Sequence, residues 1–457
     1  MVTELETQEK TTVKPIPYIK ESPVVGSLFK YQRDRLNLFM RMWREQGPVS
    51  GFHMGPFALP AFFSAEHVHS ILVEHAYDFD KGESIHNVFR PVIGNGIFTS
   101  EGDFHRRQRK IMAPPFQPRH IASYADNMVY YGEQVQQRWQ DGARINIDEE
   151  MTTITMSIIG KVLFNVDVFT ETDELGAAMA TTLNFVGHRL ARLLPTPYNW
   201  PTPQNKRAHQ AIALLRSRIQ QMIEERRASA EEGNDFLSIL LRARDDEGKP
   251  MDNEQLIDEC LTLFGAGHET TAVALTWAWY LLAQHPEQYR KLQEEARNAL
   301  GGRAATYADL TKLPYSQQVF KETLRMYPPA YAMGRAALKN IVIDGYQVHK
   351  GDVVLITPYV MHNRPDYFPR PFEFDPERFT PEREKQLPRY AYLPFGAGPR
   401  ICIGNYFAMM EGQLLLSTLA QHVTFELVPG QQITPDPGKS LTLRPDRHVQ
   451  MVVRRHV

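Results

Sequence analysis

The segment FGAGPRICIG, residues 395–404, places a cysteine inside a glycine-rich turn, and an apolar helical pattern follows it directly. Cys402 is one of only two cysteines in a chain of 457 residues. A cysteine thiolate is a soft ligand for a transition metal, and glycines allow the backbone to approach a bulky group closely. We therefore interpret Cys402 as a metal ligand. Cys260 lies in an apolar helical pattern without such a turn, which predicts an inert, buried thiol.

A second chemical motif, AGHETT at residues 266–271, lies within a long helical pattern. An adjacent His and Glu on a helix are typical of zinc proteases, which need a second histidine four residues after the first. That position is Ala272, which argues against a zinc site. The Thr270 hydroxyl can instead donate to the carbonyl of Ala266, which bends a helix and opens a small groove. For His268 we expect no special role.

Two further motifs complete the set. ETLR places Glu322 and Arg325 three residues apart on one helix face, and DPERF contains Arg378. In order and spacing, these motifs together with AGHETT and the Cys402 segment resemble the cytochrome P450 family, and the resemblance covers nearly the whole chain. The Cys402 segment matches the family pattern Phe-x-x-Gly-x-Arg-x-Cys-x-Gly at every fixed position. It is the most specific of the motifs, whereas Glu-x-x-Arg is weak when taken alone.

The resemblance implies haem b (iron protoporphyrin IX) held by the Cys402 thiolate, with O2 as co-substrate. It also implies that Glu269 and Thr270 relay protons as the catalytic acid and alcohol, and that Ala266 leaves room for dioxygen. The ring of Phe395 is expected to pack near the thiolate. The cofactor-binding residues implied in this way are His105, Arg109, Ala266, Arg335, Phe395, Arg400, Cys402 and Gly404. Of these, His105, Arg109, Arg335 and Arg400 are the expected partners of the haem propionates.

The same resemblance gives the Glu-x-x-Arg motif a structural role. Glu322 and Arg325 are expected to pair with Arg378 in a buried network that holds the Cys402 segment in register. A carboxylate buried between two guanidinium groups is favourable only when its hydrogen bonds are fully made.

The substrate pocket implied by the resemblance is mainly apolar, which predicts a lipophilic small-molecule substrate. Its expected lining residues are Phe89, Phe185, Phe264, Tyr331, Met333 and Leu441. The style of the motifs favours a fatty acid or a terpenoid, while a steroid or a polyketide stays open.

The implied activity is a monooxygenase that hydroxylates its substrate with one atom of O2. Two alternatives stay open: a haem-dependent isomerase or peroxygenase of the same fold, and a non-catalytic haem-thiolate sensor. The chain shows no flavin, ferredoxin or nicotinamide motif. Electrons are therefore expected from NAD(P)H through separate proteins, most plausibly a ferredoxin and its reductase. Arg106, Arg107 and Lys110 are expected to face outward on the docking surface for the electron carrier.

The elements that position these residues are mostly helical. Helical periodicity dominates from about residue 65 to 300, with one very long helix that ends near Pro286. A helix over 314–327 stops at two prolines, and residues 337–363 alternate as a small antiparallel sheet does. We predict a mainly α protein with a smaller β part (α+β), as the P450 fold implies. Residues 1–457 are expected to form a single haem domain without a fused reductase, preceded over 1–20 by an extended lead.

Composition limits the remaining classes of function. The formal net charge is −2, which gives no reason to expect a nucleic-acid partner. The N-terminus lacks the basic start and apolar core of a signal peptide, and the longest apolar run, residues 272–283, is too short to cross a bilayer. Two cysteines fit a reducing compartment. We therefore expect a cytoplasmic protein without a transmembrane anchor.

Overall fold

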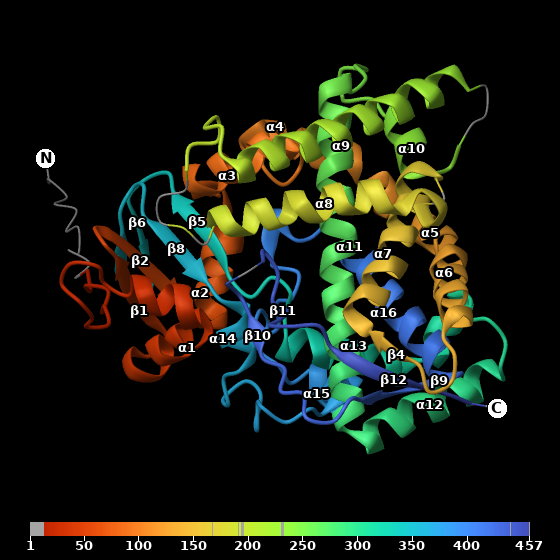
Figure 1. Ribbon diagram of the computed structural model, residues 1–457. Helices are drawn as coiled ribbons and strands as arrows, with labels where there is room; N and C mark the ends of the chain where they lie inside the picture. The colour runs from red at the N-terminus through yellow and green to blue at the C-terminus, as the bar shows by residue number, and fades with distance from the viewer. Residues whose placement is uncertain are drawn as a thin grey trace, which may run out of the picture.

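The computed structural model describes residues 13–166, 168–190, 192, 196–229, 233–438 and 440–456, with the backbone alone for 168–173. Helices make up most of the body, and a five-stranded sheet lies at its left side in Figure 1. This arrangement confirms the predicted α+β class. None of the helices in the described ranges is both long and apolar enough to cross a membrane.

The helices run as follows: α1 Leu28–Gln46, α2 Ala65–His69, α3 Glu83–Ile93, α4 Gly102–Met112, α5 Pro118–Ser123, α6 Ala125–Arg138, α7 Ile147–Phe164, α8 Val168–Leu190, α9 Pro203–Ala228, α10 Phe236–Arg242, α11 Asn253–Gln284, α12 Pro286–Leu300, α13 Pro314–Met326, α14 Pro358–His362, α15 Pro381–Glu384 and α16 Asn405–Ala420. The strands are β1 Val49–Met54, β2 Phe57–Phe62, β3 Phe79–Asp80, β4 Arg144–Asn146, β5 Met333–Ala337, β6 Ile341–Ile343, β7 Tyr346–Val348, β8 Val353–Ile356, β9 Val423–Leu427, β10 Pro435–Asp436, β11 Arg444–Pro445 and β12 Gln450–Arg455.

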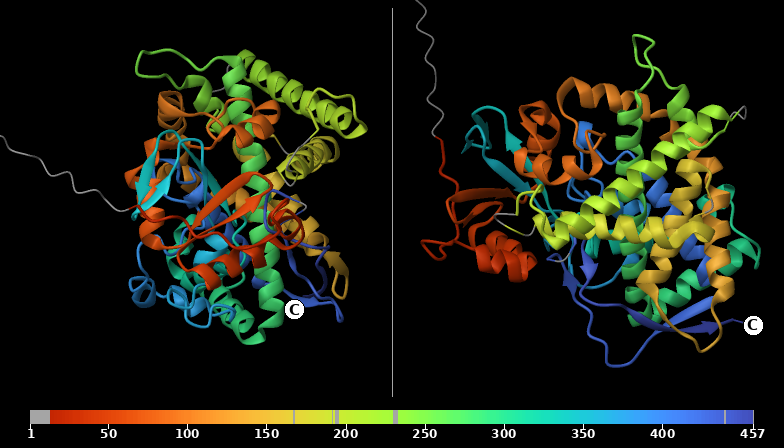
Figure 2. Two further views of the ribbon diagram at one scale, coloured as in Figure 1. Left: turned by 90° about the vertical axis from the view of Figure 1, so that its left-hand side faces the viewer. Right: turned by 45° about the horizontal axis from the view of Figure 1, so that its top comes forward.

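The long helix α11 passes through the middle of the body, and both figures show the other helices arranged around it (Figures 1 and 2). It has 32 residues, and the side chain of Asp252 caps its start by accepting from the backbone N–H of Gln255. Its end, just before Pro286, is where the sequence predicts it. Most of its side chains are buried, because helices α7, α13 and α16 pack against it.

The strands of the described residues form four small sheets. The largest has the order β1-β2-β8-β5-β3, and all its pairs are antiparallel except β2 with β8. The predicted local sheet over 337–363 is correct for β6 and β7, which pair around a turn at Gly345. It is wrong for β8, which pairs with β5 and β2 instead. That pairing joins segments far apart in the chain, so the local alternation could not reveal it.

The extended lead expected over residues 1–20 lies partly outside the described residues. From residue 13 onward the chain is extended and follows the sheet. The Lys14 N–H donates to the Gly345 carbonyl at 2.7 Å, and the Gly51 N–H donates to the Pro17 carbonyl at 2.8 Å. These bonds hold the lead against the β-rich side of the molecule.

Candidate active site

Cys402 lies in a tight turn that leads into α16. Its backbone N–H donates to the Phe395 carbonyl at 2.9 Å, which closes the turn on itself. Gly398 adopts φ +69°, and a Cβ at this position would clash with the carbonyl oxygen of Leu72. Only glycine satisfies both demands without strain. The turn therefore presents the cysteine on a short, fixed loop.

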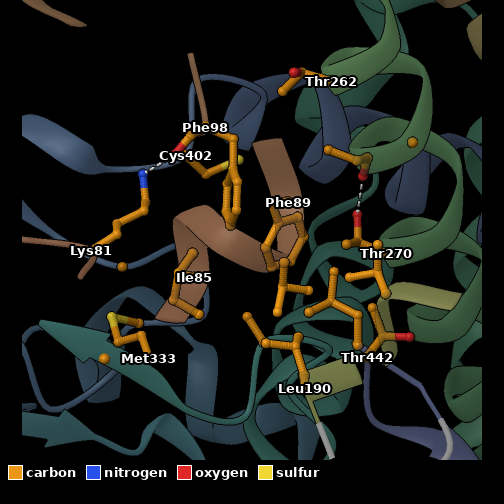
Figure 3. Close-up of a pocket in the computed structure, with 18 of the residues that line it drawn as sticks. Lys81, Ile85, Phe89, Phe98, Leu190, Thr262, Thr270, Met333, Cys402 and Thr442 are labelled. Atoms are coloured by element: carbon orange, nitrogen blue, oxygen red, sulfur yellow. Dashed lines mark hydrogen bonds between the residues drawn. The ribbon is translucent and has the colours of Figure 1, made fainter. Parts of the chain in front are cut away.

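The Cys402 side chain is exposed to a large cavity and lines its wall (Figure 3). The Gly404 N–H donates to the sulfur, and the surroundings raise the pKa of the thiol by desolvation. The Gly404 amide and the Arg109 guanidinium act in the opposite direction.

The cavity has a volume of about 1530 Å³ and is mainly apolar. This volume exceeds the range of roughly 300–1000 Å³ that holds one small ligand. It therefore has room for a cofactor and a substrate together. Helix α11 supplies one wall with Ala266, Gly267 and Thr270.

The hydrogen bond expected within α11 is present. The Thr270 hydroxyl donates to the Ala266 carbonyl at 2.8 Å, and Figure 3 shows this bond at the cavity wall. Gly267 allows α7 to approach, because a Cβ there would lie 2.7 Å from the Cδ1 atom of Ile159. His268 is buried and its Nδ1 bonds to the Phe264 carbonyl at 2.8 Å. Desolvation lowers the pKa of His268, which favours a neutral, structural ring.

Glu269 also lines the cavity, although its side chain is almost fully buried. Its Oε1 accepts from the hydroxyls of Ser440 at 2.9 Å and Thr442 at 2.8 Å. The same oxygen forms an ion pair with Arg444, whose Nη2 lies at 3.0 Å. Within the described residues, Oε2 makes no hydrogen bond. One carboxylate oxygen is thus tethered by Ser440, Thr442 and Arg444.

Five basic side chains gather at another part of the cavity. They are Lys81, His105, Arg109, Arg335 and Arg400. Desolvation and the neighbouring cations Arg400 and Arg335 lower the pKa of Lys81 to about 7. Desolvation is the largest cause and the Arg400 cation the second largest of two further shifts. They lower the pKa of Arg335 to about 10. They also lower the pKa of His105 to about 3, so the His105 ring is neutral.

Two carboxylates among the described residues act on this cluster, Asp80 and Glu101. Asp80 attracts Arg400 through space, whereas Glu101 forms an ion pair with Arg400, whose Nη1 also donates to the Ser100 carbonyl at 2.6 Å. Lys81 donates to the Phe98 carbonyl (Figure 3), and Arg109 donates to the Ile401 carbonyl at 2.6 Å. The cluster carries more positive charge than the carboxylates of the described residues neutralise. A ligand with two carboxylates, such as haem, fits this end of the cavity.

Behind the Cys402 turn lies a buried ion-pair network. Arg325 donates to both oxygens of Glu322, at 2.7 and 2.8 Å, and the Nε of Arg378 donates to Glu322 at 3.3 Å. The Nη1 of Arg325 donates to the carbonyl of His362 at 2.9 Å, and the His362 Nε2 accepts from the N–H of Leu393 at 3.0 Å. The network therefore reaches the segment that enters the Cys402 turn.

Of the six residues predicted to line the substrate pocket, Phe89, Tyr331, Met333 and Leu441 line the cavity. Phe185 and Phe264 do not line it, which corrects their prediction. Two residues along an α-helix turn the side chain through about 200°, so Phe264 lies on the face of α11 opposite to Ala266 and packs near Phe164. Phe185 is buried in a separate hydrophobic cluster with residues of α3 and α9, and its ring packs beside Tyr198.

The basic residues expected to face outward do so, but each has an acidic partner. Arg106 pairs with Asp103, Arg107 with Asp245 at 3.6 Å, and Lys110 with Asp246 at 2.5 Å. The positive charge of this face is therefore partly neutralised within the chain.

Four residues at the site have no part in the sequence prediction: Lys81, Glu101, His362 and Arg444. Lys81 lies eight residues before Phe89, which is predicted to line the pocket, and this proximity is the one signal in the sequence that could have indicated Lys81. Arg444 follows Leu441 by three residues, but nothing in the local sequence indicates that it pairs with Glu269. Glu101 and His362 reach the site through long-range packing.

Comparison with known proteins agrees with this geometry. The family model described as Cytochrome P450 matches residues 16–452. Cyclooctatin synthase of Streptomyces melanosporofaciens is 36% identical over 433 residues, which cover 93% of each chain. Pentalenene oxygenase of Streptomyces avermitilis is 30% identical over 420 residues, with 90% of this chain and 92% of the relative covered.

A solved structure shares the fold. It is described as retinoic acid bound cyanobacterial CYP120A1, and it matches with a TM-score of 0.87 at 26% identity, covering 97% of this chain and all of the other. The family match spans the Cys402 turn, α11 and the ion-pair network alike. The chain belongs to the cytochrome P450 family and is a P450 monooxygenase.

Proposed function

We propose that this protein is a haem-thiolate monooxygenase that hydroxylates a lipophilic substrate held in the cavity beside α11. The observation that carries this proposal is the convergence of three features on one apolar cavity: the Cys402 sulfur, the Thr270 hydroxyl and the cationic cluster. No single one of these features would specify the reaction. Together they provide an iron ligand, a proton donor and an anchor for carboxylates.

The residues that would hold haem are Cys402 at the iron and the cationic cluster at the propionates. Lys81, Arg335 and Arg400 offer charged donors, and neutral His105 offers one ring N–H. The Gly404 N–H bond to the sulfur would stabilise the thiolate. When bound, haem supplies the activation of O2 and the insertion of one oxygen atom into a carbon–hydrogen bond.

The side chains of α11 would manage protons. The Thr270 hydroxyl donates to the Ala266 carbonyl at rest and can turn its proton toward the cavity. We infer that the Glu269 carboxylate passes a proton to the Thr270 oxygen through Oε2. The ion pair of Oε1 with Arg444 would hold the carboxylate in one orientation.

Electrons would come from NAD(P)H through separate proteins, of which a ferredoxin and its reductase are the proposed pair. The outward face of α4, with Arg106, Arg107 and Lys110, is the proposed docking surface. Because these cations have acidic partners, docking would exchange existing ion pairs for new ones. A cytoplasmic location is part of the proposal, since Cys402 must stay a free thiolate and both cysteines are unpaired.

The proposed substrate is a terpenoid or a fatty acid. The apolar lining supports a carbon-rich ligand, with Phe89, Met333 and Leu441 among the side chains that would contact it. The relatives' names point the same way, since they refer to pentalenene and to cyclooctat-9-en-7-ol. The first name denotes a hydrocarbon with a double bond, and the second an alcohol with one.

Oxygen isotope labelling tests the proposal. The holoenzyme would be supplied with NADPH, a ferredoxin, its reductase and ¹⁸O2, and screened against terpene hydrocarbons and fatty acids. We expect products that carry one ¹⁸O atom. Products formed without incorporation of ¹⁸O2 would favour the isomerase or peroxygenase alternative. A spectrally intact holoenzyme that yields no product with any of these substrates would favour the sensor.

A further inference from the structure

A buried arginine at the end of α8 has no acidic partner among the residues that the structure describes. Arg189 lies in the last turn of this helix and lines the cavity, with only 8% of its surface exposed. Its Nη1 donates to the Thr196 carbonyl at 2.6 Å, and its guanidinium lies 5.4 Å from the ring centre of Phe185. Its Nε makes no hydrogen bond. Two neutral contacts are thus all that the described chain offers to a full positive charge.

The electrostatic surroundings of Arg189 agree with the geometry. Burial lowers the pKa of its guanidinium, and the group that acts against this is the phenol of Tyr198. No carboxylate among the described residues forms an ion pair with it. A buried cation without a counter-charge is unfavourable unless a ligand or water supplies the missing contacts.

The side chains around this position are apolar. Val88, Phe89, Val92, Val186 and Ile212 belong to one hydrophobic cluster with Phe185, against which Leu190 packs. Most of these residues also line the cavity. A ligand group that reaches Arg189 is therefore shielded from solvent, and shielding strengthens a charge-assisted hydrogen bond.

We propose that Arg189 binds the carboxylate of an otherwise lipophilic substrate. This inference rests on the proposed function, because it takes the cavity to be the substrate pocket, and it narrows the substrate class to lipophilic carboxylic acids. In Figure 3, Leu190 lies well away from Cys402, with Phe89 between them. A substrate anchored at Arg189 then presents a carbon remote from its carboxylate to the Cys402 side of the cavity.

Matched ligands test the role of Arg189. The holoenzyme is titrated with lauric acid and methyl laurate, and with abietic acid and methyl abietate, by the Soret shift and by calorimetry. The parent should bind each acid more tightly than its ester. In Arg189→Gln we expect acid binding to weaken about 10- to 100-fold, the loss of one charge-assisted contact, with little change for the esters. Arg189→Lys keeps the charge and should retain most of the acid affinity.

Two controls keep this test decisive. Arg207→Gln removes an exposed arginine of α9 that does not line the cavity, and it should leave all four affinities unchanged. The ferrous–CO spectrum of Arg189→Gln should match the parent, and its melting temperature should be no lower than that of the parent, because the variant removes an unpaired buried charge. The inference is overturned if the parent binds the acids no better than the esters, or if Arg189→Gln weakens both equally. The proposed function is judged separately by ¹⁸O2 incorporation, which does not depend on a carboxylate.

Discussion

Lys81 offers a sharp test of how the cavity would hold haem. Its ammonium group lies among Arg335 and Arg400, and burial together with these cations lowers its pKa from 10.5 to about 7. The haem propionates would supply the missing negative charge. Lys81→Met removes the ammonium group and keeps a long apolar side chain. We therefore expect the variant to bind haem more weakly, while its haem-free form gains stability because a buried like-charge repulsion is lost.

The magnitude follows from two quantities. A hydrogen bond to a charged group is worth about 1.5–3 kcal/mol, so at pH 6.5 haem should dissociate roughly 10- to 100-fold faster from Lys81→Met. Above pH 7 the haem-free Lys81 is mostly neutral and must take up a proton to pair with a propionate. This contribution to the equilibrium affinity for haem therefore falls about tenfold for each pH unit above 7, so the partition of haem between the protein and apomyoglobin differs less and less between parent and variant.

The assay is the transfer of haem to excess apomyoglobin, followed at the Soret band between pH 6.5 and 9. Cys402 must lose a proton to bind iron, which has the opposite pH dependence, but parent and variant share it. Lys339→Met is the matched control, because Lys339 is an exposed lysine paired with Asp78. Equal dissociation rates for the parent and Lys81→Met at pH 6.5 would refute the reasoning.

Three further predictions concern single side chains. Gly398→Ala places a methyl group against the Leu72 carbonyl at a positive φ, so we expect a lower melting temperature by calorimetry and a smaller haem content per chain. Burial raises the pKa of Glu411 to about 8. The unfolded chain releases this proton near pH 4.5, so the free energy of unfolding of the parent falls as the pH rises from 4.5 to 8. Relative to the parent, Glu411→Gln should gain up to about 1.4 kcal/mol in the free energy of unfolding per pH unit over this range, measured by urea unfolding. A stability difference that is independent of pH would contradict this. Thr270→Ala should consume NADPH but lower the product formed per NADPH about tenfold or more, whereas Thr276→Ala, which loses a similar bond to the Ala272 carbonyl, should keep the parent ratio.

The features that the sequence predicts well are local ones. The turn around Cys402 depends on glycines within a few residues of it, and the bond from Thr270 to Ala266 spans one helical turn. The extent of α11 follows from a long apolar pattern that ends at Pro286. In each case the physical cause lies within the same stretch of chain, so the residues alone are sufficient.

The features that the sequence misses depend on tertiary packing. Phe264 is aromatic and close to the AGHETT motif, but which face of α11 borders the cavity is decided by the packing of α7. His362 links Arg325 to Leu393 only because α13 and α14 lie together in the fold. Arg444 reaches Glu269 across 175 residues of sequence. None of these contacts leaves a periodic or compositional signal.

The measurement that tests the central claim most directly is the ferrous–CO difference spectrum of the purified protein, beside that of Cys402→Ser. The account predicts that the parent shows the strongly red-shifted Soret band of thiolate-ligated haem, and that the serine variant lacks it. Equal haem content in the two samples would show that only the iron ligand has changed. A parent spectrum without the red-shifted band, in intact and freshly prepared protein, would contradict the assignment of Cys402 as the iron ligand and the function proposed from it.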